Sequence, residues 1–176
     1  MPRHADPERD AAACAAIYAP YVLEGVASFE ESPPSAEAMG RRIATASRTH
    51  PWLVAERDGQ VAGFAYGAPH HERAAYRWAA DVSVYVDSAH HRHGIGRQLY
   101  ERLLTLLRQQ GFHVACGGVT LPNDASVRLH EALGFEAVGV YRAIGYKAGA
   151  WHDVGWWQLR LERIDGPPAE PRGPDI

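Results

Sequence analysis

Two glycines stand two residues apart where a β-branched segment gives way to an amphipathic helical pattern. The turn reads His91-Arg92-His93-Gly94-Ile95-Gly96, and Arg97 follows it. Glycine has no Cβ in the way, so backbone N–H groups can converge there on an anion, and a helix start adds partial positive charge. Neither the dinucleotide-binding glycine pattern nor a P-loop lysine is present. The turn therefore predicts phosphate binding without nucleotide hydrolysis, and an ordinary helix start is the alternative.

Two side chains near this turn have the chemistry to move protons. Asp81 lies in the apolar segment before the turn, where a carboxylate is uncommon unless it is paired or functional. His130 lies seven residues after Asn123, close to two helical turns, so both can project from one helix face. Histidine ordinarily titrates near pH ~6.5, which suits proton transfer in either direction. A solvated edge carboxylate and a partly buried histidine bonded to a carbonyl are the alternatives.

The composition describes an ordinary globular chain. It has 176 residues, of which 46% are hydrophobic and 22% charged, as in one domain with a packed core. Lys and Arg number 18 against 21 Asp and Glu, a formal net charge of −3, so we expect no nucleic-acid partner. No run approaches the ~18 apolar residues of a membrane span, and the N-terminal MPRHADPERD lacks the apolar core of a signal peptide. We expect a cytoplasmic protein without membrane contact.

Cysteine and histidine usage predicts no metal site. Cys14 and Cys116 stand alone in apolar-leaning segments and are expected to be buried, reduced thiols. The histidines of 70–71 and 90–93 are neighbours in sequence, which sends adjacent side chains to opposite faces of a strand, and Arg92 among them would repel a cation.

The elements that must position these residues follow from periodicity and turn signals. Ser35 can cap a helix, and Arg57-Asp58-Gly59 predicts a hairpin turn. Helices are expected at 10–24 with a kink or break at Pro20, at 35–47, from the glycine turn to Gly111 and at 123–133, and strands at 52–56, 60–66, 76–86, 113–121, 135–146 and 151–161.

The order of these elements predicts the fold class. A strand, a helix and a strand in succession favour parallel pairing, whereas hairpins pair antiparallel. We therefore expect an α/β protein with a central mixed, mostly antiparallel sheet and helices on both faces. Alternation along strand 76–86 places Val82, Val84 and Val86 on one face and Asp81, Ser83 and Tyr85 on the other. Residues 1–161 form the single expected domain, and the proline-rich residues 162–176 form an expected flexible tail.

Several motifs in order resemble one family. The turn at 91–96 resembles the pyrophosphate-cradling loop of the GNAT superfamily of N-acetyltransferases, with His91 where that family usually carries Gln or Arg. LPNDASVRLHEALGF, at 121–135, resembles its later motif, an Asn-initiated helix that ends in Gly-Phe. HPWLVAERDGQVAGFAYG and GYKAGAWHDVGWWQL are similar to the phosphinothricin and methionine sulfoximine acetyltransferases. The resemblance spans about Arg3 to Leu161 and implies the GNAT acyl-CoA N-acyltransferase fold.

The resemblance also implies a co-substrate, acetyl-CoA, and residues that contact it. The strand before the turn would contact the pantetheine arm, and the turn would hold the pyrophosphate. The matching residues are Val84, Tyr85, Val86, His91, Arg92, His93, Gly94, Ile95, Gly96, Arg97, Asn123 and Ser126. Asp81 stands where this branch usually carries Glu and would take the proton of the amine, directly or through water. His130 matches a histidine proposed to assist proton transfer.

The implied substrate is a small amino-acid-like amine of the phosphinothricin, methionine sulfoximine or methionine sulfone type. The matching residues are Ser28, Phe29 and Glu30 after the first helix, and Arg73 and Tyr76 in a later loop. Arg73 could grip a carboxylate with its planar fork, or be an ordinary exposed loop arginine.

No cysteine or serine has a nucleophile's setting, so we expect direct attack in a ternary complex. The branch's usual homodimer is expected here too. A peptide or protein N-terminal acetyltransferase and a non-catalytic acyl-CoA-binding module are the alternatives.

Overall fold

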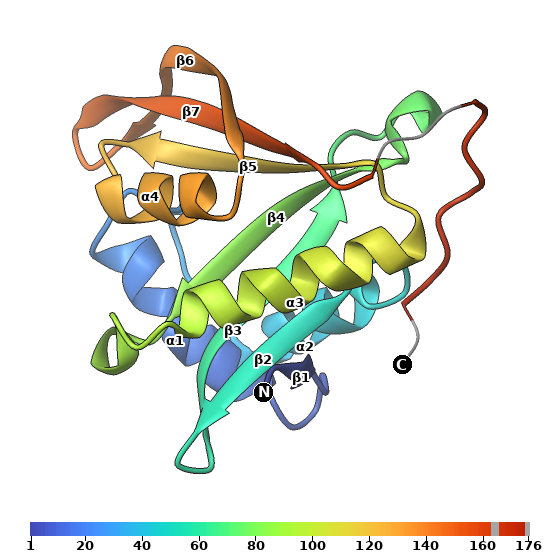
Figure 1. Cartoon of the computed structure of the whole chain (residues 1–176). Coiled ribbons are helices and arrows are strands. Elements are labelled where there is room, and N and C mark those ends of the chain that lie inside the picture. The colour runs from blue at the N-terminus through green and yellow to red at the C-terminus, as the bar shows by residue number, and fades with distance from the viewer. Residues whose placement is uncertain (163–165, 175–176) are drawn as a thin grey trace.

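The computed structural model describes residues 1–162 and 166–174 and shows a seven-stranded sheet with helices on both faces (Figure 1). The strand order is β1-β2-β3-β4-β5-β7-β6, and β4 and β5 are the one parallel pair among the described strands. The expected mixed, mostly antiparallel sheet is confirmed. The elements in chain order are β1 (Arg3–His4), α1 (Ala11–Leu23), α2 (Ala36–Ala46), β2 (Trp52–Arg57), β3 (Gln60–Pro69), β4 (Ala79–Val86), α3 (Ile95–Gln110), β5 (Val114–Leu121), α4 (Asp124–Ala132), β6 (Glu136–Lys147) and β7 (Ala150–Arg160).

Each face of the sheet has its own helix layer and core. On one face α3 contributes Leu99, Leu103 and Leu107, all fully buried, and α4 packs beside it. On the other face Val22 of α1 and Ile43 of α2 pack against the sheet. Burial of each such aliphatic side chain stabilises the fold by roughly 1.5–3 kcal/mol. None of the helices in the described ranges is both long and apolar enough to cross a bilayer.

Three local predictions are confirmed. Ser35 caps α2, because its Oγ accepts from the Ala38 N–H at 3.1 Å. Asp58 and Gly59 connect β2 to β3 with both residues at positive φ, which suits the twist of a two-residue hairpin. Gly111 ends α3 in the left-handed region, at φ 91°.

Three parts of the sheet differ from the sequence-based prediction, and the first is β3, which runs on to Pro69 rather than ending at 66. β4 begins at Ala79 rather than Tyr76, because residues 74–76 form a 3-10 turn. The aromatic composition of 76–78 favours a strand, but the Trp78 indole instead stacks under the Arg77 guanidinium and donates to the Ala169 carbonyl at 2.7 Å. β1 was not predicted, since two residues carry no periodicity, and it pairs with β2 at the sheet edge.

The described part of the C-terminal segment, 166–174, makes hydrogen bonds and an ion pair with the domain. Arg172 exchanges backbone and side-chain hydrogen bonds with Gln110 at the end of α3, at 2.7 and 2.8 Å. Glu170 pairs with Arg77 at 2.7 Å. A proline-rich chain forms no internal hydrogen-bond ladder, so its polar groups bond to the end of α3 and the loop before β4.

The pairing of β4 with β5 stops after three residue pairs, the last of which joins Asp81 to Cys116. β4 nevertheless continues to Val86 against β3, and β5 continues to Leu121 against β7. The two strands therefore diverge, as Figure 1 shows beside α4. The facing backbone edges of 82–86 and 117–121 have no ladder between them, and this separation positions the site.

Candidate active site

A cleft of about 590 Å³ opens where β4 and β5 separate. His130 lines it, whereas His93 lies outside the lining. Asn123 Oδ1 accepts from the Ser126 N–H at 3.1 Å and caps α4 at the edge of the cleft. Of the residues predicted to contact a coenzyme, the cleft brings together Val84, Tyr85, Val86, His91, Arg92, Gly94, Ile95, Gly96, Arg97, Asn123 and Ser126.

The glycine turn presents backbone donors to this cleft. Gly94 adopts φ 76° directly before Ile95, the first residue of α3, and no side chain of the described residues caps the helix. The first N–H groups of a helix have no partner within it, so those of the opening turn can bind an anion. A Cβ on Gly96 would lie 3.5 Å from Val86 and 3.6 Å from Leu129, so a branched side chain would fill the space between β4 and α4. The turn fits a pyrophosphate.

The side chains around the turn differ in how free they are to bind phosphate. His91 Nε2 lies 3.0 Å from the Val86 carbonyl, so its ring folds back onto the end of β4. Arg97 donates to Glu101 one helical turn along α3, at 2.8 Å. Arg92 adopts φ 63°, and its guanidinium has no polar partner among residues 1–162 and 166–174. Arg92 is therefore better placed than His91 to pair with a phosphate.

His130 is 3% exposed and lies against the backbone of Gly117. Its Nδ1–H donates to the Ser126 carbonyl at 2.8 Å, which leaves Nε2 as an acceptor 3.4 Å from the Tyr100 hydroxyl. Tyr100 donates to the Val82 carbonyl at 3.2 Å. Burial lowers the pKa of His130, and the bond to Ser126 opposes this in part. From the sequence, a buried histidine bonded to a carbonyl is the alternative to a proton-transfer role, and this bond is present. The neutral ring still offers Nε2 as a proton acceptor at the cleft.

Asp81 lies outside the lining of the cleft, on the face of β4 opposite Val82. Its Oδ1 accepts from His70 Nδ1–H at 2.6 Å, and 33% of its side chain is exposed. Burial raises the pKa of Asp81, and the bond from His70 lowers it in part. Burial raises the pKa of the Tyr66 phenol on β3, and the nearby charge of Asp81 adds to this. A partly desolvated carboxylate that solvent can still reach has the environment of a general base.

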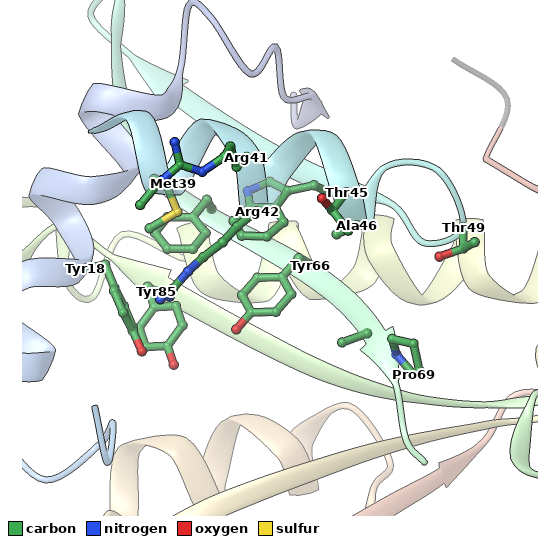
Figure 2. Close-up of a pocket in the computed structure, with 14 residues that line it drawn as sticks. Tyr18, Met39, Arg41, Arg42, Thr45, Ala46, Thr49, Tyr66, Pro69 and Tyr85 are labelled. Carbon is green, nitrogen blue, oxygen red and sulfur yellow. The ribbon is translucent and has the colours of Figure 1, made fainter. Parts of the chain in front are cut away.

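A second cavity of about 610 Å³ lies on the face of the sheet that α1 and α2 cover (Figure 2). Tyr18, Tyr66 and Tyr85 line it, and Arg42 reaches across it from α2. Arg42 donates to both carboxylate oxygens of Glu30, at 2.7 and 2.9 Å. Tyr85 lines both cavities, so β4 separates the cleft from a chamber that aromatic side chains line in part.

The predicted substrate loop, residues 28–30, borders this chamber and is anchored. Ser28 Oγ lies 2.7 Å from the Tyr18 hydroxyl, which donates to Glu30 at 2.9 Å. Lys147 of β6 donates to the Ser28 carbonyl at 2.6 Å. Phe29 is 39% exposed and packs against β6. The loop therefore connects α1 to the β6–β7 hairpin with Phe29 at its surface.

Arg73 and Tyr76 lie in the loop between β3 and β4, outside the lining of both cavities. Arg73 is exposed, and its guanidinium contacts no polar group in the part of the chain that the structure describes. Its backbone N–H donates to His71 Nδ1 at 3.1 Å, and the Tyr76 ring lies 4.9 Å from the His71 ring. The 3-10 turn at 74–76 holds this pair at the surface, so the carboxylate clamp stays a prediction.

His70, Asp81 and Cys116 form the one candidate group of metal ligands in the described ranges, with ligand atoms within 4.8 Å of one another. His70 Nδ1 and Asp81 Oδ1 lie 2.6 Å apart. Two ligands of one zinc ion, each ~2.0–2.3 Å from it, stand about 3 Å or more apart. Burial and the charge of Asp81 raise the pKa of Cys116 to about 11, so its thiol stays protonated. The group is a hydrogen-bonded pair beside a thiol, and we assign no metal.

Three residues of the site were missed by sequence reasoning. Tyr100 has the helical spacing of the buried face of α3, and only its hydroxyl, which needs a partner when buried, could have singled it out. Arg42 and Tyr66 face each other across the second cavity only after α2 packs on β3, and no local pattern marks that contact.

Comparison with known proteins gives a consistent family. Residues 5–156 match the acetyltransferase (GNAT) domain. The chain is 44% identical over 163 residues to the phosphinothricin N-acetyltransferase of Streptomyces viridochromogenes, covering 93% of this chain and 87% of that protein. It is 38% identical over 120 residues to the L-methionine sulfoximine/L-methionine sulfone acetyltransferase of Salmonella typhimurium, covering 68% and 70%.

A solved structure agrees with these matches. The phosphinothricin acetyltransferase of Sinorhizobium meliloti in complex with AcCoA has a TM-score of 0.92 and 34% identity, covering 97% of this chain and 93% of that one. The expected fold and the resemblance are confirmed, and the acyl-CoA-binding module is the weaker alternative because the matched relatives are named as enzymes. The chain belongs to the GNAT family of acetyltransferases.

Proposed function

We propose that this chain transfers the acetyl group of acetyl-CoA to the amino group of a small amino-acid-like substrate. The observation that carries the proposal is that Tyr85 lines two cavities on opposite faces of β4. One of them has the glycine turn at its edge. Two reactants entering from opposite faces would meet along β4 between Tyr85 and Asp81, whose register partner Ala68 also lines the second cavity. The names of the phosphinothricin and methionine sulfoximine acetyltransferases to which the chain is similar support the substrate class.

The cleft has groups for both halves of acetyl-CoA. The N–H groups of the opening turn of α3 and the Arg92 guanidinium would bind the pyrophosphate. The backbone of 84–86, which has no β5 partner, would hydrogen-bond the pantetheine arm like an added strand. When bound, acetyl-CoA supplies a thioester carbonyl that a neutral amine can attack.

Asp81 and His130 would handle the protons. Asp81 would accept a proton from the substrate ammonium, because only the neutral amine has a lone pair for attack. Its raised pKa makes it a stronger base than an exposed aspartate. His130, on the other face, keeps its Nδ1–H on the Ser126 carbonyl, so its Nε2 would accept a proton at the cleft.

The cysteines favour direct attack over an acetyl-enzyme. Cys14 is fully buried, and burial raises the pKa of its thiol to about 12. Cys116 is half-buried, with its pKa raised to about 11. A thiol at such a pKa holds little thiolate near neutral pH and is a poor nucleophile. Amine and thioester would therefore react within one ternary complex.

Thiol release from acetyl-CoA, measured across a panel of amines, tests the proposal. We expect turnover with phosphinothricin, methionine sulfone and methionine sulfoximine, and little with alkylamines of equal length. A peptide acetyltransferase is the second candidate, and peptides with a free N-terminus belong in the panel. Preference for peptides would replace the small-substrate proposal, and no turnover with any amine would reject the activity.

We also propose a homodimer built on the β6–β7 hairpin and a cytoplasmic location. β6 is an edge strand of the sheet, and an open edge with exposed large apolar side chains favours association. These side chains, 40–65% exposed, are Val138, Val140, Tyr141, Ile144, Tyr146 and Trp151. The two free cysteines suit a reducing compartment. Light scattering should give a dimer mass that Val140→Arg reduces to the monomer; a monomeric wild type would reject the dimer.

A further inference from the structure

His70 and Asp81 form a hydrogen-bonded pair across the end of two strands. β3 ends at Pro69, opposite Ala80, and the His70 N–H donates to the Ala79 carbonyl at 3.4 Å. The antiparallel register therefore continues to His70, which stands diagonally across from Asp81 on the same face, and its ring reaches Asp81, 2.6 Å from Nδ1 to Oδ1. The edge of Trp156 meets the ring at 5.9 Å between centroids and helps to fix it.

The protonation of the two side chains defines the donor and the acceptor in the contact between His70 and Asp81. An ionised carboxylate only accepts hydrogen bonds, so Nδ1 of His70 carries the hydrogen and donates to Oδ1. Oδ2 of Asp81 has no hydrogen-bond partner within residues 1–162 and 166–174. Because the side chain of Asp81 remains one-third exposed, Oδ2 stays accessible to a substrate or a bridging water.

We infer that His70 is a positioning residue for Asp81: its Nδ1–H fixes one carboxylate oxygen so that the other is oriented and ionised to accept the proton of the amine. The inference rests on the proposed acetyl transfer. Burial alone would favour the protonated carboxylic acid, and the bond from His70 opposes burial. The neighbouring groups Tyr66 and Cys116 have raised pKa values and stay neutral near pH 7, so neither brings a second charge beside Asp81.

Two substitutions separate the hydrogen bond from packing. His70→Leu removes the donor, whereas His70→Asn keeps an N–H at about the position of Nδ1. We expect His70→Leu to lower kcat at least about tenfold, as for the loss of a hydrogen bond to a charged group, and His70→Asn to recover most of it. His4→Leu is the matched control, because His4 is a histidine of β1, at the edge of the sheet beyond β2, and makes no contact with Asp81. Its kcat should stay within about twofold of wild type.

The pH profile reports the charge of Asp81 directly. Without His70, burial acts unopposed, so the pKa of Asp81 rises and the acidic limb of kcat moves to higher pH. In the double variant His70→Leu/Asp81→Asn, kcat should equal that of Asp81→Asn alone, because His70 acts through the carboxylate.

Three results would overturn the inference. The first is an acidic limb of kcat that stays at the wild-type pH in His70→Leu, and the second is an equal loss of kcat in His70→Leu and His70→Asn while thermal unfolding is unaltered. The third is a kcat in the double variant that falls by the product of the two single losses. If wild type itself fails to acetylate any amine, the proposed function fails instead. If His70→Leu folds poorly, the pH dependence of kcat in His70→Asn decides. An acidic limb at the wild-type pH supports the donor role of His70, and an acidic limb at higher pH rejects it.

Discussion

His130 lies directly over the backbone of Gly117, where a Cβ on residue 117 would collide with Nε2. β5 therefore needs glycine at this position to let the imidazole reach the cleft. We expect Gly117→Ala to displace the ring and lower kcat by roughly tenfold to a hundredfold, since small misplacements of a reacting group have effects of that size.

Gly139→Ala is the control for this change, because Gly139 also lies in a strand and a Cβ there meets nothing within 4 Å. Steady-state kinetics of both variants test the relationship. Normal turnover in Gly117→Ala would mean that the position of His130 does not matter to the reaction.

Gly94→Val and Gly96→Val should abolish acetyl-CoA binding while leaving most of the fold intact. Gly94 adopts φ 76°, which a branched residue resists, and a valine at 96 would fill the space between Val86 and Leu129. Gly59→Val, at φ 78° in the β2–β3 hairpin, controls for backbone strain away from the cleft. Titration calorimetry measures the affinity for acetyl-CoA. If a folded Gly94→Val or Gly96→Val variant binds acetyl-CoA as wild type does, the turn is not part of the coenzyme site.

Asp81→Asn and His130→Phe should each lower kcat by ~10²–10⁴-fold, the usual effect of losing a proton-transfer group. The affinity for acetyl-CoA should change little. In wild type, kcat should rise with pH as Asp81 ionises, and at a higher pH than for an exposed aspartate, because burial raises its pKa. Near-normal rates in both variants at neutral pH would show that the amine loses its proton elsewhere.

Arg73→Ala should raise the KM for the amino acid roughly ten- to a hundredfold, the value of a charge-assisted pair with a carboxylate. The exposed guanidinium has no polar partner in the described chain, so it is free to make this pair. Arg73→Lys should restore only part of the affinity, because a point charge lacks the fork. Acetyl-CoA kinetics serve as the internal control, and an unchanged KM would make Arg73 an ordinary surface residue.

His50 should make the fold less stable in mild acid. Its ring packs 4.8 Å from the Phe112 ring, Nε2 is buried without a partner in the described residues, and burial lowers its pKa to about 4. In the unfolded chain it binds a proton from pH ~6.5, so between these values the unfolded state holds more protons and stability falls as pH falls. Lowering the pH from 7 to 5 should cost about 2 kcal/mol. Urea denaturation should show a smaller loss in His50→Leu; an equal loss would assign it to other groups.

The local parts of the fold could be predicted from the sequence, and the long-range contacts could not. The hairpin at Asp58-Gly59, the cap at Ser35 and the end of α3 at Gly111 depend on residues within one or two turns. β4 was predicted to begin too early, because the contacts of Trp78 with Arg77 and the C-terminal segment outweigh aromatic β-propensity.

The site shows the same division. The glycine turn could be predicted from adjacent residues, whereas the part of β4 that lines the cleft followed from the resemblance to the GNAT family. The pairing of His70 with Asp81 depends on the register of Ala68 with Asp81, which is set by the whole sheet. Likewise, His91 matches a phosphate-binding position, but its ring bonds to Val86 once the end of β4 comes within reach.

The central claim is most directly tested by mass spectrometry of the amino acid after reaction. The enzyme is incubated with acetyl-CoA and phosphinothricin, and both the small-molecule product and the intact protein are weighed. The account predicts one acetyl group on the amino nitrogen of phosphinothricin, formed in step with free CoA, and an unmodified protein in the absence of the amino acid. Release of CoA with phosphinothricin unchanged, or an acetyl group carried by the protein before the amine is added, would contradict it.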